Sequence, residues 1–148
     1  MSFAERISFV DQHGGPRGLA ELLGRAAALV HAGRAAGVEA AALGRTLHAR
    51  LNPANDPRPA VAVIPVVDLA EVPAMFHGLV RGVIRGRSPD VTVWIDFHGG
   101  LRDSLALSTA AASVVALDGA GGVAAIETGP FDTAVLERLV ATLEALRA

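Results

Sequence analysis

The sequence contains no cysteine, and this absence excludes a disulfide framework and any metal site built on thiolates. Lysine is absent as well, so all 13 basic residues are arginines. They form no basic run, and the formal net charge is −2. A chain with this charge pattern lacks the electrostatic footprint of proteins that bind nucleic acids or anionic membranes.

Other common signals are missing too. The N-terminus has no basic segment followed by an apolar stretch, and no apolar run approaches the roughly 18 residues of a membrane span. The glycines follow neither the G-x-G-x-x-G spacing nor the phosphate-binding P-loop pattern. We therefore expect a cytoplasmic protein with no membrane insertion, no cofactor and no bound nucleic acid. A length of 148 residues with 51% hydrophobic content predicts one domain over 1–148.

One short phrase occurs twice in the chain. Residues 9–17 read Phe-Val-Asp-Gln-His-Gly-Gly-Pro-Arg, and residues 94–102 read Trp-Ile-Asp-Phe-His-Gly-Gly-Leu-Arg. Each copy ends an apolar run that is typical of a strand and precedes a stretch with helical spacing. Strand ends followed by glycines and a helix start are places where α/β proteins bind anions.

The pattern of apolar residues predicts alternating strands and helices. Strands are expected at 6–10, 60–67, 91–96, 113–117 and 123–126, and helices at 16–30, 38–51, 69–83, 101–112 and 131–146. This order indicates a flavodoxin-like three-layer α/β/α fold, with a mostly parallel four- to five-stranded sheet in the order 2-1-3-4. Pro65 cannot donate a ladder hydrogen bond, so its strand is expected at the edge of the sheet.

In that topology the first and third strands are neighbours, and the two copies of the phrase meet in one crevice. His13 is then the candidate nucleophile toward a phosphoryl group, and Asp96 is the carboxylate that orients it. The other expected members are an anion cradle and two accessory side chains. The cradle comprises Gly14, Gly15, Gly99, Gly100 and Arg102, and the accessory residues are Asp11 and His98.

Residues 7–23 and 91–106, which contain the two copies, resemble the two signature segments of the IIA component of mannose-type sugar phosphotransferase systems. The resemblance implies that His13 takes a phosphoryl group from an HPr-like phosphocarrier and passes it to a IIB-like acceptor, with Asp96 orienting the imidazole. It also implies a phosphotransferase with a phosphohistidine intermediate, a homodimer and a role in sugar transport.

Four other interpretations fit the same residues. The run Asp-x-x-Gly-Gly-x-Arg also resembles the ligand turn of CRISPR-associated Rossmann-like domains, which would make Arg102 a contact for cyclic oligoadenylate. Two Asp-x-His pairs could instead hold zinc or iron, although no metal is our main expectation. The chain could be a non-catalytic interaction domain. Alternatively, Asp11 and Asp96 could simply cap the turns that follow them. The remaining histidines, His31, His48 and His77, are expected on helices at or near the surface.

Overall fold

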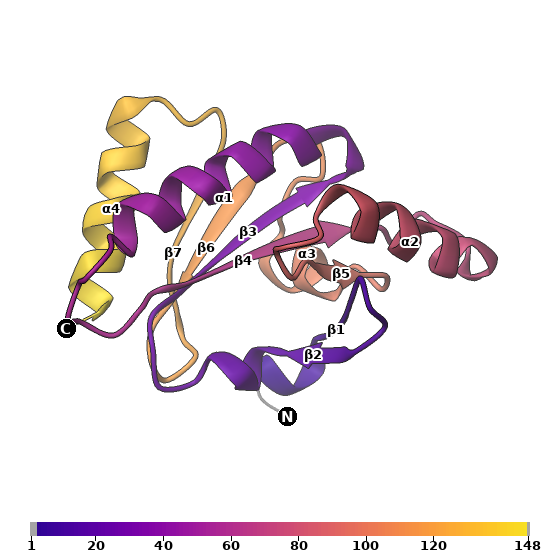
Figure 1. Ribbon diagram of the computed structural model, residues 1–148, viewed down its shortest axis with the longest axis horizontal. Helices are drawn as coiled ribbons and strands as arrows, with labels where there is room; N and C mark the ends of the chain where they lie inside the picture. The colour runs from indigo at the N-terminus through magenta and orange to yellow at the C-terminus, as the bar shows by residue number, and fades with distance from the viewer. Residues whose placement is uncertain (1–2, 148) are drawn as a thin grey trace.

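The computed structural model describes residues 3–147, which build one seven-stranded sheet in the order β2-β1-β5-β4-β3-β6-β7 (Figure 1). The strands are β1 Ser8–Asp11, β2 Pro16–Gly18, β3 Ala27–Gly33, β4 Ala62–Asp68, β5 Trp94–Asp96, β6 Ser113–Leu117 and β7 Val123–Thr128. The α-helices are α1 Gly37–Leu51, α2 His77–Arg87, α3 Gly100–Leu105 and α4 Thr133–Arg147. Four short 3-10 turns are η1 Ala4–Arg6, η2 Leu19–Leu22, η3 Arg34–Ala36 and η4 Ala74–Phe76.

The sheet is mixed. Strands β3, β4 and β5 run parallel to one another, whereas β1 is antiparallel to β2 and β5, and β6 is antiparallel to β3 and β7. The expectation of a flavodoxin-like, mostly parallel sheet of four or five strands in the order 2-1-3-4 is therefore wrong. The physical reason is that hairpins build both edges of this sheet, so helical crossovers connect only its centre.

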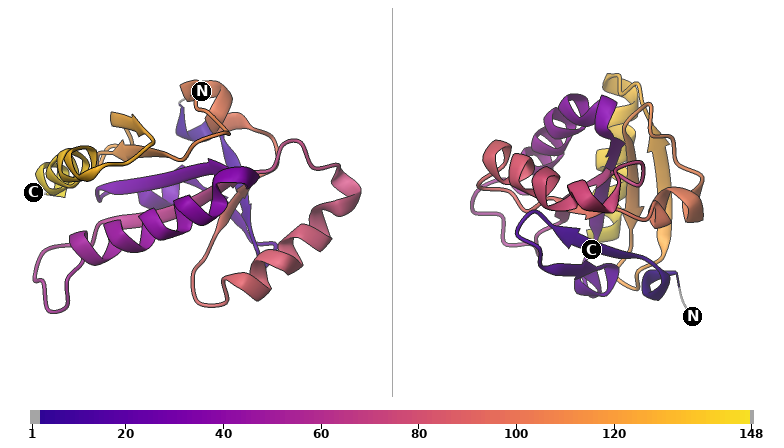
Figure 2. Two further views of the ribbon diagram at one scale, coloured as in Figure 1. Left: turned by 90° about the horizontal axis from the view of Figure 1, so that it is seen from above. Right: turned by 90° about the vertical axis from the view of Figure 1, so that its right-hand side faces the viewer.

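Helices α1 and α4 cover one face of the sheet, where they pack on alternate residues of β3 and β6 (Figures 1 and 2). The largest buried side chains of this layer are Leu47 and Leu51 of α1 and Leu139 and Leu143 of α4. The opposite face is covered by η2, α3 and the hairpin of β1 and β2. Because β3 is buried on both faces, it lies at the centre of the protein.

The helix expected at 16–30 is absent, and because this error left β2 and β3 out of the predicted sheet, the predicted strand order was wrong as well. The segment contains β2, η2 and most of β3 instead. All seven residues of β3 are buried, so its sequence Ala-Ala-Leu-Val-His-Ala-Gly carries a continuous apolar run rather than an alternating one. Such a run fits helical spacing as well as strand spacing, and periodicity alone cannot distinguish them.

The edge position predicted from Pro65 is also wrong, because β4 lies between β3 and β5. Pro65 pairs in register with Val30 on one side. On the other side β5 begins only opposite Val66, so Pro65 has no strand neighbour there. The short β5 gives this position the open side that a proline needs in a sheet.

The rest of the pattern agrees more closely. Strands β6 and β7 and helices α1 and α4 lie where the sequence predicts them. The helix expected at 69–83 forms later, as α2, and the one expected at 101–112 ends early because Ala106 adopts a left-handed conformation, with φ of 55°. None of the helices in residues 3–147 has the length and apolar character needed to cross a membrane.

Candidate functional site

The two copies of the repeated phrase lie on neighbouring strands, but the strands are antiparallel. Val10 pairs with Ile95 and Asp11 pairs with Trp94, so the chain leaves β1 and β5 in opposite directions. The turns that follow the two strands therefore lie at opposite ends of this strand pair. His13 does not meet Asp96, and the two glycine pairs do not share one crevice.

In the first copy the backbone of the turn donates hydrogen bonds to the aspartate of the same phrase, Asp11. The buried Asp11 accepts hydrogen bonds at Oδ1 from the backbone N–H groups of His13 and Gly15, each at 2.9 Å, and at Oδ2 from Arg17 Nε at 2.9 Å. Burial alone would raise the pKa of Asp11, but the hydrogen bonds from Gly15, Arg17 and His13 outweigh it and lower that pKa. These amides hold an internal carboxylate, so they leave no cradle for an external anion.

Gln12, between Asp11 and His13, has a structural role that the sequence did not reveal. Its fully buried side chain donates to the carbonyls of Ser88 and Val91 and accepts from the N–H of Val93 at 2.9 Å. The first copy of the phrase thus fixes the loop between α2 and β5. His13 itself is exposed and makes no side-chain hydrogen bond to the described residues.

The second copy follows the same design. Asp96 is fully buried, and its Oδ1 accepts N–H groups from His98, Gly99 and Gly100 at 3.0, 2.8 and 3.3 Å. Its Oδ2 accepts the N–H of Leu101 at 3.1 Å, which caps the first turn of α3. His98 is exposed. Both aspartates therefore cap their own turns, as the structural interpretation of the phrase expected.

A different group of polar side chains gathers at the carboxyl ends of the parallel strands. Gly33 of β3 pairs with Asp68 of β4, which pairs in turn with Asp96 of β5, so the three strand ends lie at one edge. Two residues earlier in β3, His31 is fully buried with its Nε2 3.8 Å from Asp68 Oδ2. The carboxyl edge of parallel strands is where α/β proteins bind their ligands.

This histidine and this aspartate are incompletely satisfied. Both ring nitrogens of His31 and the Oδ2 atom of Asp68 are buried without a hydrogen-bond partner in the described chain. Burial lowers the pKa of His31, against the opposing effect of the carboxylates of Asp68 and Asp96. Buried polar groups without partners are rare in folded proteins and often mark functional positions. Sequence reasoning missed His31 because it placed the residue at the end of a helix.

Arg102 of α3 also contacts this group of polar side chains, through Asp68. Its Nη1 lies 3.3 Å from both carboxylate oxygens of Asp68, and its Nε lies 3.1 Å from Asp103 Oδ1. Gly33 has no room for a side chain, since an added Cβ would lie 2.6 Å from the carbonyl oxygen of Thr109. The segment around Thr109 is thereby held close to the end of β3.

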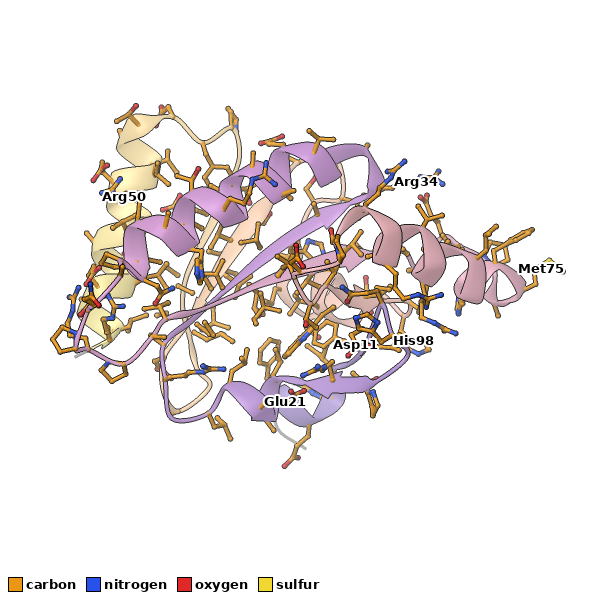
Figure 3. The ribbon with its side chains drawn as sticks, in the orientation of Figure 1. Asp11, Glu21, Arg34, Arg50, Met75 and His98 are labelled. Carbon is orange, nitrogen blue, oxygen red and sulfur yellow. The ribbon has the colours of Figure 1, made fainter. Side chains whose placement is uncertain are left out.

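A hollow of about 300 Å³ opens beside these groups. Its lining comprises Gly33, Arg34, Ala35, Asp68, Glu71, Arg102, Thr109 and Ala110. Arg34, whose position Figure 3 shows, places Nη2 3.6 Å from Glu71 Oε1. The lining thus carries two arginines and two carboxylates, in two ion pairs that face one hollow. We call this hollow the edge pocket.

The metal alternative finds no counterpart in the structure. Within residues 3–147 no three His, Asp or Glu side chains come together in a way that could hold a metal ion. His98 and His13, the histidines of the two Asp-x-His pairs, lie on separate turns, and the aspartates of those pairs accept backbone N–H groups instead.

Comparisons with known proteins identify the fold. No family model matches the chain, and no curated protein matches it. Among solved structures it is similar to the exposed lipoprotein thioredoxin Etrx1 of Streptococcus pneumoniae, at 14% identity and a TM-score of 0.65, covering 90% of this chain and 96% of that one. A putative thiol:disulfide interchange protein DsbE of Chlorobium tepidum gives 16% identity and a TM-score of 0.69, with coverage of 95% and 92%. A secreted disulfide oxidoreductase of Mycobacterium tuberculosis gives 17% and 0.61, with coverage of 95% and 96%.

The fold is therefore thioredoxin-like, and the resemblance to mannose-type IIA proteins is wrong. The roles that rested on it are contradicted as well: the histidine phosphoryl carrier, the HPr-like and IIB-like partners, the homodimer and the part in sugar transport. The cyclic oligoadenylate alternative loses its Rossmann-like fold, and Arg102 instead pairs with Asp68 and Asp103. The cytoplasmic location stays a prediction, since two of the similar proteins are described as exposed or secreted.

Proposed function

We propose that this protein binds a small zwitterionic ligand, of the α-amino acid class, in the edge pocket, and that it does so without thiol–disulfide chemistry. The observation that carries the proposal is the pairing of two arginines with two carboxylates around one hollow. One of these carboxylates, Asp68, reaches down to the buried His31, whose ring nitrogens have no hydrogen-bond partner among the described residues.

The similar structures have titles that name disulfide oxidoreductases, but this chain cannot supply their reactive group. Thiol–disulfide exchange requires attack by a cysteine thiolate. The 148 residues contain no cysteine, so they provide neither the attacking thiolate nor a disulfide to receive it. A protein of this fold without a thiol can still use the carboxyl edge of its sheet as a binding site.

The ion pairs of the edge pocket are loose enough to open. Arg102 Nη1 lies 3.3 Å from the Asp68 oxygens, and Arg34 Nη2 lies 3.6 Å from Glu71 Oε1. Strong charge-assisted hydrogen bonds are shorter, at about 2.7–2.9 Å. A ligand that carried only an anion would draw an arginine away and leave a carboxylate unpaired. A zwitterion satisfies both signs, because its carboxylate binds a guanidinium while its ammonium takes the freed carboxylate.

The size and depth of the pocket agree with such a ligand. A hollow of about 300 Å³ stands at the lower end of the range for small-molecule sites, which suits a molecule of amino-acid size. The side chain of Asp68 reaches from the lining down to the buried His31. The Oδ2 of Asp68 accepts no hydrogen bond from the described residues and lies 3.3 Å from Arg102 Nη1, so it is one acceptor that an ammonium group could use once Arg102 turns to the ligand's carboxylate.

Isothermal titration calorimetry with the individual α-amino acids tests the proposal. At least one should bind, and its N-acetyl and C-amide derivatives should each bind about tenfold more weakly, because each loses one charge-assisted interaction. Arg34→Gln and Glu71→Gln should weaken binding, whereas Arg45→Gln, an exposed arginine on α1, should leave it unchanged. Absence of binding by all the amino acids, or equal binding of the blocked derivatives, would refute the proposal.

A further inference from the structure

Helix α2 differs from the other long helices because none of its residues is buried. Four large apolar side chains of η4 and α2 are exposed: Met75, Phe76, Leu79 and Val83. Met75 is 81% exposed and Leu79 is 68% exposed. The spacing of four between Met75, Leu79 and Val83 puts them on one side of the helix. In Figure 3 Met75 lies at the far tip of the molecule and points away from its body.

The same segment has an unusual charge. From residue 72 to residue 89 the chain has no acidic residue but three arginines, Arg81, Arg85 and Arg87, although the whole chain has a formal net charge of −2. None of the three forms an ion pair with a carboxylate in the part of the chain that the structure describes. The segment therefore combines an uncovered apolar stripe with uncompensated positive charge.

We propose that α2 docks the protein on an anionic lipid surface, with Met75, Leu79 and Val83 in the headgroup region and Arg87, the next residue at the same spacing of four, on lipid phosphates and carboxylates. An interfacial helix has large apolar residues on one face and basic residues on its polar face, as α2 does with Arg81 and Arg85. Basic side chains near an anionic membrane each strengthen binding. The inference does not depend on what the edge pocket binds.

The shape of this region favours a flat surface over a protein partner. Helix α2 projects at one margin of the molecule, away from α1 and α4 (Figures 1 and 2). It presents a convex stripe, and neither the edge pocket nor the hollow between α1 and Phe131 is lined by α2. A planar lipid interface can contact the whole length of a projecting helix, whereas a protein would need a groove built for it.

Helix α2 is also attached to the rest of the protein by side-chain contacts, so docking of α2 would hold the whole protein at the lipid surface. Arg85 Nη1 donates to the carbonyl of Gln12 at 2.9 Å, and the ring of His77 stacks on Phe97 with centroids 3.6 Å apart. Both contacts lie on the side away from the apolar stripe. Membrane contact therefore needs no rearrangement of the fold.

Flotation with lipid vesicles measures this docking directly. The protein should float with vesicles of equal parts phosphatidylcholine and phosphatidylserine, should not float with pure phosphatidylcholine, and should be released by salt. Leu79→Asp should abolish flotation, and Arg87→Gln should weaken binding roughly fivefold. The controls are Val38→Asp and Arg45→Gln on α1; Val38 is 89% exposed, so the same change of charge is made at an exposed position of a helix that the protein covers on its other side.

The absence of cysteine allows a second, independent measurement. Met75→Cys and Val38→Cys each create a single thiol that can carry an environment-sensitive fluorophore. With anionic vesicles the emission should shift to shorter wavelength for the label at position 75 and stay unchanged for the label at position 38.

Three results would overturn the proposal. They are no flotation with anionic vesicles at low salt, a loss in Val38→Asp as large as that in Leu79→Asp, and a change from dimer to monomer in Leu79→Asp by sedimentation without any vesicle binding. The last result would assign the stripe to contact between copies of the chain instead.

Discussion

Helices α4 and α2 are both amphipathic in sequence, yet only α4 is covered by the rest of the protein. Helix α4 buries Leu139, Val140 and Leu143 against β6 and α1, whereas α2 buries no residue. The spacing of apolar residues predicts a helix with one apolar side in both cases. The spacing does not reveal whether other elements of the protein pack on that apolar side. Because nothing in the described chain packs over the apolar side of α2, we assign it to contact with an external partner.

The arginines of the two regions differ in the same way. On the side of α1 and α4, Arg50 pairs with Glu137 and Arg138 with Glu127, each at 2.8 Å. On α2 neither Arg85 nor Arg87 pairs with a described carboxylate. A charged group that the fold does not neutralise is free to meet an external charge, so its charge is a better guide to partners than the net charge of the chain.

The largest expected effect compares a leucine of the buried layer under α1 with a leucine of the exposed side of α2. Leu47→Ala, in α1, should lower the free energy of unfolding by about 3 kcal/mol, because it opens a cavity in a fully buried layer. Leu79→Ala, in α2, should change it by less than about 0.5 kcal/mol, because the side chain is already in water. Urea denaturation followed by circular dichroism measures both values. Equal losses would mean that α2 is covered in solution.

The next effect compares two arginines. The buried Arg147 donates from Nε to the carbonyl of Pro59 at 2.9 Å and from Nη2 to the carbonyl of Leu51, and it pairs with Glu144 at 3.2 Å. Arg147→Ala should lower the free energy of unfolding by about 2 kcal/mol, because these buried acceptors lose a charged donor.

Arg87→Ala is the matched substitution in α2. Since Arg87 is exposed and makes no hydrogen bond or ion pair with the described residues, its removal should leave the unfolding midpoint in urea unchanged. A clear loss of stability in Arg87→Ala would show that α2 depends on its arginines for folding, and the contrast between the two regions would fail.

The sequence predicted the two long helices that the protein covers on one face. The spacing of Leu43, Leu47 and Leu51 placed α1 correctly, and the spacing of Leu139 and Leu143 placed α4. It failed at β3, whose run contains no alternation and whose helical spacing was a coincidence of an alanine-rich, wholly buried strand. The equally buried β6 was placed correctly. Because the predicted helix at 16–30 also covered β2, the antiparallel hairpin of β1 and β2 was not predicted either.

The candidate site failed for a related reason. The phrase Asp-x-His-Gly-Gly was correctly located at two strand ends, but its chemistry turned out to be local, since Asp11 and Asp96 each bind the amides that follow them. A short motif does not state whether its polar groups face inward or outward. His31 and Asp68 are far apart in the sequence, and only the register of β3 and β4 brings them together.

The smallest expected effect concerns His31, at the centre of the sheet. Burial lowers its pKa in the folded state, so the unfolded chain takes up a proton first as the pH falls through the ordinary histidine value of about 6.5. The unfolded state then binds more protons than the folded state, and the free energy of unfolding declines with falling pH in that window. His31→Leu should show a flatter pH dependence, whereas His48→Gln, at an exposed position of α1, should follow the wild type. Urea titrations between pH 7.5 and roughly pH 5 compare the three slopes, and a His31→Leu slope equal to that of the wild type would show that another group is protonated on unfolding.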